Sequence, residues 1–146
     1  MGSKLGFAET GSEDEKLITE LLDWMHKNSA DFTNTFLNLC KEEIPDGALY
    51  ASESFQGWHV RWQNRLRKEE QSLETSFALM RSVNPTVIPR NHKVEEALQA
   101  GEEGDLEPLH DLLNAVENPY EDGDHLLPFQ APPEPGEKVL QTFCGT

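Results

Sequence analysis

The sequence predicts an all-α fold: a small irregular helical bundle of about five to six helices, followed by an extended, proline-rich acidic tail. Three observations favour this class. Apolar residues recur at helical spacing in several segments, capping residues precede these segments, and no segment shows the period-two alternation of a half-buried strand. No unit of ~34 to 45 residues repeats with matching positions, which argues against a helical solenoid.

The N-terminal part predicts a helical hairpin. Residues 12–15, with the sequence SEDE, form a capping-box pattern that begins a helix from about Glu13 to Lys27. After a break in the apolar pattern, Asp31 can cap a second helix. The turn sequence IPDG then ends this second helix near Glu43.

Apolar positions at helical spacing continue from about residue 54 to residue 83. The polar run over residues 67–72 leaves open whether this stretch forms one long helix or two. Trp58 and Trp62 lie one turn apart, beside Arg61 and Arg65, an arrangement that would suit base stacking. Tryptophans at this spacing are more often core residues, and we favour the core interpretation.

Residues 83–92 predict a stiff connector, because Pro85 and Pro89 hold the residues before them in extended geometry. Beyond the connector we expect a helix that ends near Gly101 or Gly104. Asp105 can cap a further helix with an apolar stripe from Leu106 to Val116.

The helical pattern stops at Asn118, and five prolines among acidic residues predict an extended tail that either wraps over the helical body or stays disordered. We therefore divide the chain into a helical module over residues 1–117 and a tail over residues 118–146 that ends in Cys-Gly-Thr.

Charge is unevenly distributed. The chain of 146 residues carries a formal net charge of −15, and no Lys or Arg occurs between Val94 and Glu137, where 13 Asp and Glu residues fall. This acidic half repels phosphates, so we expect no nucleic-acid partner. No apolar run approaches the ~20 residues of a membrane-spanning helix and no signal-peptide core is present, so we expect no membrane partner and a soluble intracellular protein.

The two cysteines predict no disulfide framework, since roughly a hundred residues separate Cys40 from Cys144. Cys40 falls on the apolar face of a predicted helix, as a core residue would. Cys144 lies near the C-terminus, where a thiol is accessible, although the acidic tail would raise its pKa. It is either a chemically idle residue or a candidate redox residue.

Other signals of chemistry are weak. The five histidines lack metal-ligand spacing, and Gly-rich phosphate loops and catalytic signature motifs are missing. We therefore assign no catalytic, cofactor-binding or metal residue. A candidate anion-binding or interdomain contact is formed by Arg90, Asn91 and His92, because the proline connector holds them rigidly at the start of a predicted helix. The alternative is that Arg90 pairs with acidic residues such as Glu95.

Several segments together resemble the C-terminal region of the selenoprotein O family, also called the YdiU family. The most specific is the run from Asn84-Pro85 to Pro89-Arg90-Asn91, together with the end TFCGT. The resemblance covers nearly the whole chain and extends to residues 4–7 (KLGF), 31–36 (DFTNTF), 58–65, 118–120 (NPY) and 131–133 (APP).

The resemblance implies a parent protein with a kinase-like fold that transfers AMP from ATP to protein Ser, Thr or Tyr hydroxyls, using Mg²⁺ or Mn²⁺. The family's catalytic and metal-binding residues belong to its kinase-like portion and have no counterpart here, so the chain alone should bind no cofactor and should not catalyse the transfer. Cys144 matches the position of selenocysteine in other members, which implies a bacterial, cytoplasmic, cysteine-form member with a redox-capable tail.

The resemblance also implies partners. These are the missing kinase-like portion of the same chain and the protein substrates of the parent. Apolar helix faces left uncovered favour self-association of the fragment. Two other functions stay open. The first is a free-standing helical interaction module whose acidic face binds a basic partner. The second is a thiol oxidoreductase that acts through Cys144, although the lack of a nearby resolving cysteine disfavours it.

Overall fold

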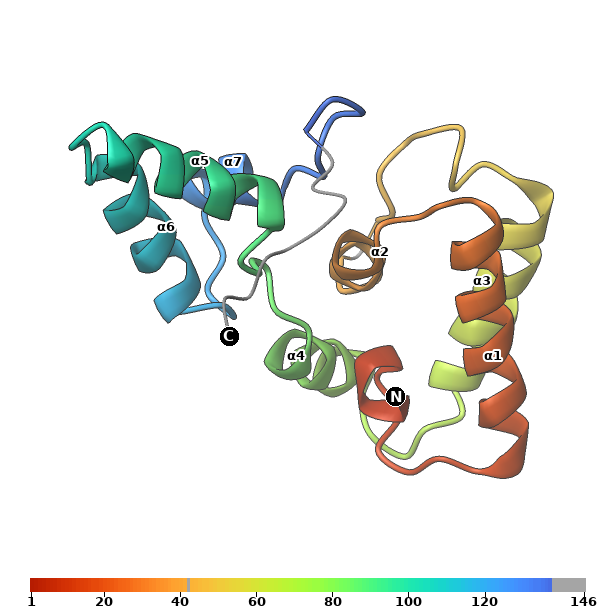
Figure 1. Cartoon of the computed structure of the whole chain (residues 1–146). Coiled ribbons are helices and arrows are strands. Elements are labelled where there is room, and N and C mark those ends of the chain that lie inside the picture. Colours follow the sequence, from red (N-terminus) through yellow and green to blue (C-terminus); the bar gives the residue numbers. More distant parts are fainter. Residues whose placement is uncertain (42, 138–146) are drawn as a thin grey trace. The chain divides into compact units, whose positions relative to one another are not determined.

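The chain folds into two helical units (Figure 1). The computed structural model describes residues 1–41 and 43–137, and within them every regular element is an α-helix or a 3₁₀-helix, so the predicted all-α class is confirmed. The first unit is Met1–Pro85 and the second begins at Thr86. This boundary lies inside the predicted proline connector.

The first unit contains a short 3₁₀-helix and four α-helices. These are η1 (Gly2–Leu5), α1 (Ser12–Lys27), α2 (Phe32–Leu39), α3 (Glu53–Leu66) and α4 (Leu73–Val83). The stretch that the sequence left open is thus two helices. The polar run ends α3, and Ser72 begins α4 by accepting a hydrogen bond from the Thr75 N–H.

Local details of two helix ends differ from the predictions. The α1 cap lies one residue earlier than predicted: Asp14 accepts the Gly11 N–H at 2.9 Å, so the helix starts at Ser12. Asp31 caps α2 as predicted, through the Asn34 N–H at 2.8 Å. However, α2 ends at Leu39 instead of near residue 43, because the chain tightens there: the Cys40 N–H is shared between the carbonyls of Phe36 and Leu37, and the Lys41 N–H donates to the Asn38 carbonyl three residues back.

Tryptophans form the centre of the first unit. Trp58 and Trp62 are each 2% exposed, and their rings stack with centroids 5.9 Å apart. The Trp58 indole N–H donates to the Leu17 carbonyl at 2.8 Å, and that of Trp62 donates to the Leu5 carbonyl at 3.0 Å. The core interpretation is therefore confirmed, and α3 is fixed to both α1 and η1.

A second set of bonds joins η1 to the end of α4. The Lys4 ammonium donates to the Val83 carbonyl at 2.9 Å, and the buried Asn84 amide donates to the Lys4 carbonyl at 3.0 Å. Gly6 follows η1 with a φ of 83°, and a Cβ there would lie 3.2 Å from atoms of Ser76 and Met80. Only glycine permits both this backbone conformation and this close approach.

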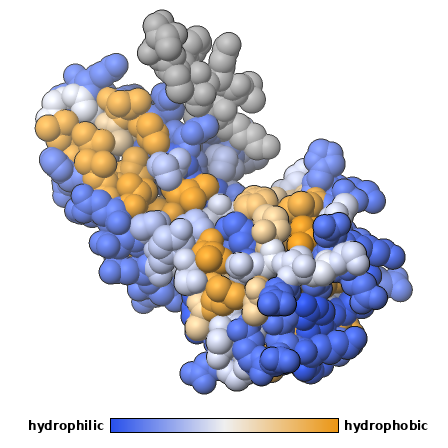
Figure 2. All heavy atoms as spheres, turned by 90° about the horizontal axis from the view of Figure 1, so that it is seen from below, coloured by the Kyte–Doolittle hydropathy of each residue, from blue (hydrophilic) through white to orange (hydrophobic). Residues whose placement is uncertain are grey.

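The second unit contains α5 (Asn91–Glu102), α6 (Glu107–Glu117), η2 (Asp124–Leu126) and α7 (Leu127–Gln130). Its small core is formed by the buried residues Val87, Ala115 and Leu126. Leu98 on α5, Leu106 just before α6 and Leu113 on α6 are about half exposed. Figure 2 shows that apolar residues gather on one face of this unit.

The described residues after Asn118, 119–137, contain more regular structure than the predicted extended tail. Instead of remaining extended, this segment forms η2 and α7, because Leu126 becomes buried against the core. The Thr86 backbone N–H donates to the Pro119 carbonyl and the Thr86 hydroxyl donates to the Glu121 carbonyl, each at 2.6 Å, which holds the start of this segment in place. The division into a module over 1–117 and a tail over 118–146 concerns the chain's place in a longer protein and stays a prediction.

No helix in the described ranges 1–41 and 43–137 is both long and apolar enough to cross a membrane.

Replacement of Trp62 by Phe should destabilise the first unit. The change removes the donor to the buried Leu5 carbonyl and part of the core volume, so we expect the free energy of unfolding to fall by about 2–3 kcal/mol. Trp24→Phe is the matched control, because the Trp24 indole bonds only weakly to Ser52, at 3.4 Å, and should cost about 1 kcal/mol. Urea unfolding followed by circular dichroism measures both, and equal losses would contradict the role given to the Trp62 bond.

Candidate functional site

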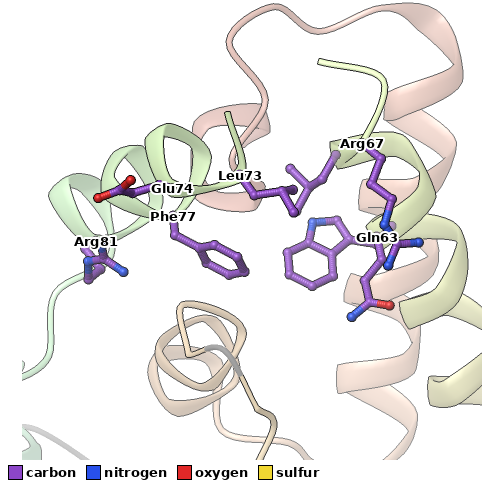
Figure 3. Close-up of a pocket in the computed structure, with 8 residues that line it drawn as sticks. Gln63, Arg67, Leu73, Glu74, Phe77 and Arg81 are labelled. Atoms are coloured by element: carbon purple, nitrogen blue, oxygen red, sulfur yellow. The ribbon is translucent and has the colours of Figure 1, made fainter. Parts of the chain in front are cut away.

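An apolar groove between α3 and α4 is the candidate functional site of the first unit (Figure 3). Its volume is about 570 Å³. It is lined by Trp62, Gln63, Leu66 and Arg67 on the α3 side and by Leu73, Glu74, Phe77 and Arg81 on the α4 side.

Aromatic and aliphatic side chains form the interior of the groove. Trp62 and Leu66 are buried beneath it, and Phe77 meets the Trp62 ring edge-on with centroids 6.5 Å apart. Leu73 and Phe77 point from α4 toward α3 (Figure 3), yet Leu73 remains 44% exposed. The groove therefore presents apolar surface that the described part of the chain leaves uncovered.

Arginines stand at the two sides of the groove. Arg67 follows the end of α3 and Arg81 lies in the last turn of α4 (Figure 3). Both side chains are exposed, and neither forms an ion pair within residues 1–41 and 43–137. Arg67 donates to the Asn64 side chain at 3.1 Å, which leaves its other N–H groups for a ligand.

A separate polar cluster joins the start of α1 to the end of α3. The Arg65 guanidinium donates to both oxygens of Asp14, at 2.7 and 3.1 Å, and pairs with Glu69. The same guanidinium lies over the Phe7 ring, 4.7 Å from its centroid. This set of contacts holds the helices together, so we assign the cluster a structural role.

The Asp14 carboxylate is kept ionised by its partners. Its burial would by itself raise the pKa, but the hydrogen bonds from Arg65 and from the Gly11 N–H, with the Arg65 charge, outweigh burial and lower the pKa. The hydrogen bonds that Arg65 donates to Asp14 in turn raise the pKa of the Arg65 guanidinium. The pair is therefore charged at neutral pH.

Cys40 is a buried thiol without the marks of a reactive one. Its Sγ donates to the Phe36 carbonyl at 3.2 Å and lies 3.5 Å from the Asn84 amide nitrogen. Burial raises the pKa of the thiol, and the Asn84 hydrogen bond and the charges of Arg81 and Lys4 only partly oppose this. The prediction that Cys40 is a core residue is confirmed.

The predicted site residues lie elsewhere. Cys144 falls outside the described residues, and its redox role stays a prediction. Arg90, Asn91 and His92 stand at the start of α5 in the second unit; Arg90 is buried, Asn91 is exposed and His92 is intermediate. An anion or interdomain contact at these three residues also stays a prediction.

Within residues 1–41 and 43–137, no group of three or more His, Cys, Asp or Glu side chains could hold a metal ion. His59 instead stacks on the rings of Phe55 and Trp62, and burial lowers its pKa. It is thus a packing residue of α3.

The α3–α4 groove was missed by the sequence reasoning. Leu73 and Phe77 belong to the apolar pattern of residues 54–83 and lie one helical turn apart. Their spacing predicts that they share a face, but it does not tell how much of that face the rest of the fold covers.

Comparisons with known proteins give a consistent result. The family described as "Protein adenylyltransferase SelO" matches residues 1–117. The curated "Protein nucleotidyltransferase YdiU" of Alcanivorax borkumensis is 50% identical over the whole chain, that of Nitrosococcus oceani 45% and that of Bacillus cereus strain AH820 42%. The chain spans 30% of the length of each of these relatives.

Replacement of Asp14 by Asn should lower the free energy of unfolding at neutral pH and make that free energy depend less on pH in the acid range. We expect a loss of about 1–3 kcal/mol at pH 7, because the charged hydrogen bonds to Arg65 are weakened. A lowered pKa in the folded state means that the stability Asp14 contributes is present above its ordinary pKa of 3.8 and is lost as the pH falls through the folded value.

Urea midpoints measured between pH 7 and pH 2.5 test this expectation, with the exposed Glu13→Gln as the control. The loss for Asp14→Asn should shrink below pH 3.8. A loss that stays constant over the whole range would refute the assignment of the acid dependence to Asp14.

The Cys40 thiol should resist labelling while the protein is folded. In a Cys144→Ser variant, Cys40 is the remaining cysteine. Because it is buried and its pKa is raised, we expect it to react with a thiol reagent at pH 8 at least roughly a hundredfold more slowly than in urea. Rapid labelling without denaturant would show that the Cys40 site opens readily.

Proposed function

The chain belongs to the protein adenylyltransferase SelO family, and on this premise we propose that it is a non-catalytic helical part of a longer protein adenylyltransferase. In this proposal the longer protein transfers AMP from ATP to Ser, Thr or Tyr hydroxyls of other proteins, with Mg²⁺ or Mn²⁺, in the bacterial cytoplasm. The present chain is its C-terminal part and supports a kinase-like portion.

One observation carries the proposal: relatives that match the chain from end to end are more than three times as long as the chain. Most of each relative thus lies outside the matched region, and the proposed activity is assigned to that larger part. The partly buried ion pair of Asp14 and Arg65 joins α1 to α3, which agrees with a supporting role.

Support of another portion requires a surface for it. The α3–α4 groove and the half-exposed leucines on α5 and α6 are apolar surfaces of the kind that interfaces within a larger protein cover. Cys144 completes the proposal as a candidate redox residue, because the family resemblance implies that it matches the position of selenocysteine in other members.

A second candidate function, binding of a basic partner, is favoured by the charge of α5. Glu95 and Glu96 on α5 and Glu103, the residue that follows its C-terminal end, line one shallow hollow of the second unit. This hollow is shallow and exposed, so we rank this candidate below the first.

The proposal predicts that AMP transfer requires the longer protein. Incubated with ATP labelled at the α-phosphate and with Mg²⁺ or Mn²⁺, the full-length protein should label protein acceptors, whereas residues 1–146 alone should not. Omission of the metal is the control. Labelling by the short chain would contradict its non-catalytic role, and labelling by neither would favour the acidic interaction module.

The same assay tests Cys144. If the full-length Cys144→Ser variant responds to oxidant and reductant just as the unmodified protein does, the redox part of the proposal fails while the transferase part stands.

A further inference from the structure

We propose that the α3–α4 groove binds an apolar side chain flanked by carboxylates, supplied by the part of the same polypeptide that lies outside these 146 residues. This inference rests on the proposed function, since it requires the longer protein. It goes further by naming the surface of contact and the chemistry of the segment that occupies it.

The shape and lining of the groove suit an apolar anchor. A volume of about 570 Å³ lies in the range of built binding pockets, which is about 300–1,000 Å³. Trp62 and Leu66 supply a rigid, buried base, while Leu73 and Phe77 supply an apolar wall that is still open to solvent. An aromatic or branched aliphatic side chain placed there would cover the exposed part of Leu73.

The charged side chains beside the groove indicate which residues would flank the apolar side chain that binds in it. Arg67 and Arg81 are two of only 12 basic residues, against 27 acidic ones, and both line the same apolar groove. Glu74 is the one acidic residue in the lining. Guanidinium groups bind carboxylates with two parallel hydrogen bonds, so Asp or Glu next to the anchor would satisfy both arginines.

The remainder of the polypeptide fits this groove better than a second copy does. Uncovered apolar faces favour self-association of the fragment, but two copies would each bring a formal charge of −15, and this repulsion opposes a second copy as the occupant of the groove. A segment of the same polypeptide is present at an effective concentration of roughly millimolar, so a small apolar contact with two charge pairs is enough to keep it bound. The relatives supply more than twice this chain's length as a source of such a segment.

Site-specific photo-cross-linking identifies the occupant. In the full-length protein, p-benzoylphenylalanine replaces Leu73, which lies at the open side of the groove. We expect a cross-link within one polypeptide, to an apolar residue outside these 146 residues that has Asp or Glu within a few positions. A cross-link to a second copy, to another protein or to no protein would overturn the proposal.

The rate of alkylation tests the role of the arginines. In the full-length protein, iodoacetamide should modify a Leu73→Cys residue slowly, as followed on its peptide by mass spectrometry. The alkylation rate reports the fraction of molecules in which the segment has left the groove. The double substitution Arg67→Glu and Arg81→Glu should therefore raise the alkylation rate roughly three- to tenfold. Arg61→Glu is the matched control, because Arg61 is exposed on α3, pairs with Glu20 and lies outside the groove.

The outcomes separate this inference from the proposed function. If the Leu73→Cys residue reacts as fast as an exposed cysteine, or if the double arginine variant leaves the rate unchanged, the groove proposal fails. AMP transfer by the unmodified full-length protein would still stand in that case. Conversely, a mapped cross-link in a protein without AMP transfer would support the groove and reject the transferase.

Discussion

Everything in the first unit depends on α3, and in particular on the two hydrogen bonds that its tryptophans donate. Trp58 bonds to a carbonyl of α1 and Trp62 bonds to a carbonyl of η1, so one helix face fixes two segments that are far away in the sequence. Both bonds are buried, where a lost donor costs more than it does in water. Stacked aromatic rings along the same face fill the space between these segments.

Polar bonding reinforces this arrangement at its edges. Arg65 joins the last turn of α3 to the first turn of α1 through Asp14, and Asn84 and Lys4 join the end of α4 to η1. Because these bonds surround the tryptophan core, α3 and α4 are held at fixed positions. The groove between them is thus a built feature of the unit, with a buried base and an exposed wall.

The proposed function and the groove proposal are linked by one physical idea. A portion of a longer protein keeps apolar surface that its own helices do not cover, because another portion covers it. The α3–α4 groove has this character, and the arginines beside it add a preference for carboxylates. This explains why a chain with so large an excess of acidic residues places two of its few arginines beside apolar side chains.

Sequence by itself determined the helical class, the Asp31 cap, the break at the proline connector and the family, since spacing, capping chemistry and proline geometry are local properties. It also assigned Trp58, Trp62 and Cys40 to the core. Only the tertiary structure decided that the chain after Asn118 forms η2 and α7, and that Leu73 stays exposed beside a buried Trp62. Both results depend on which distant segment covers a given side chain, and helical spacing carries no information about that.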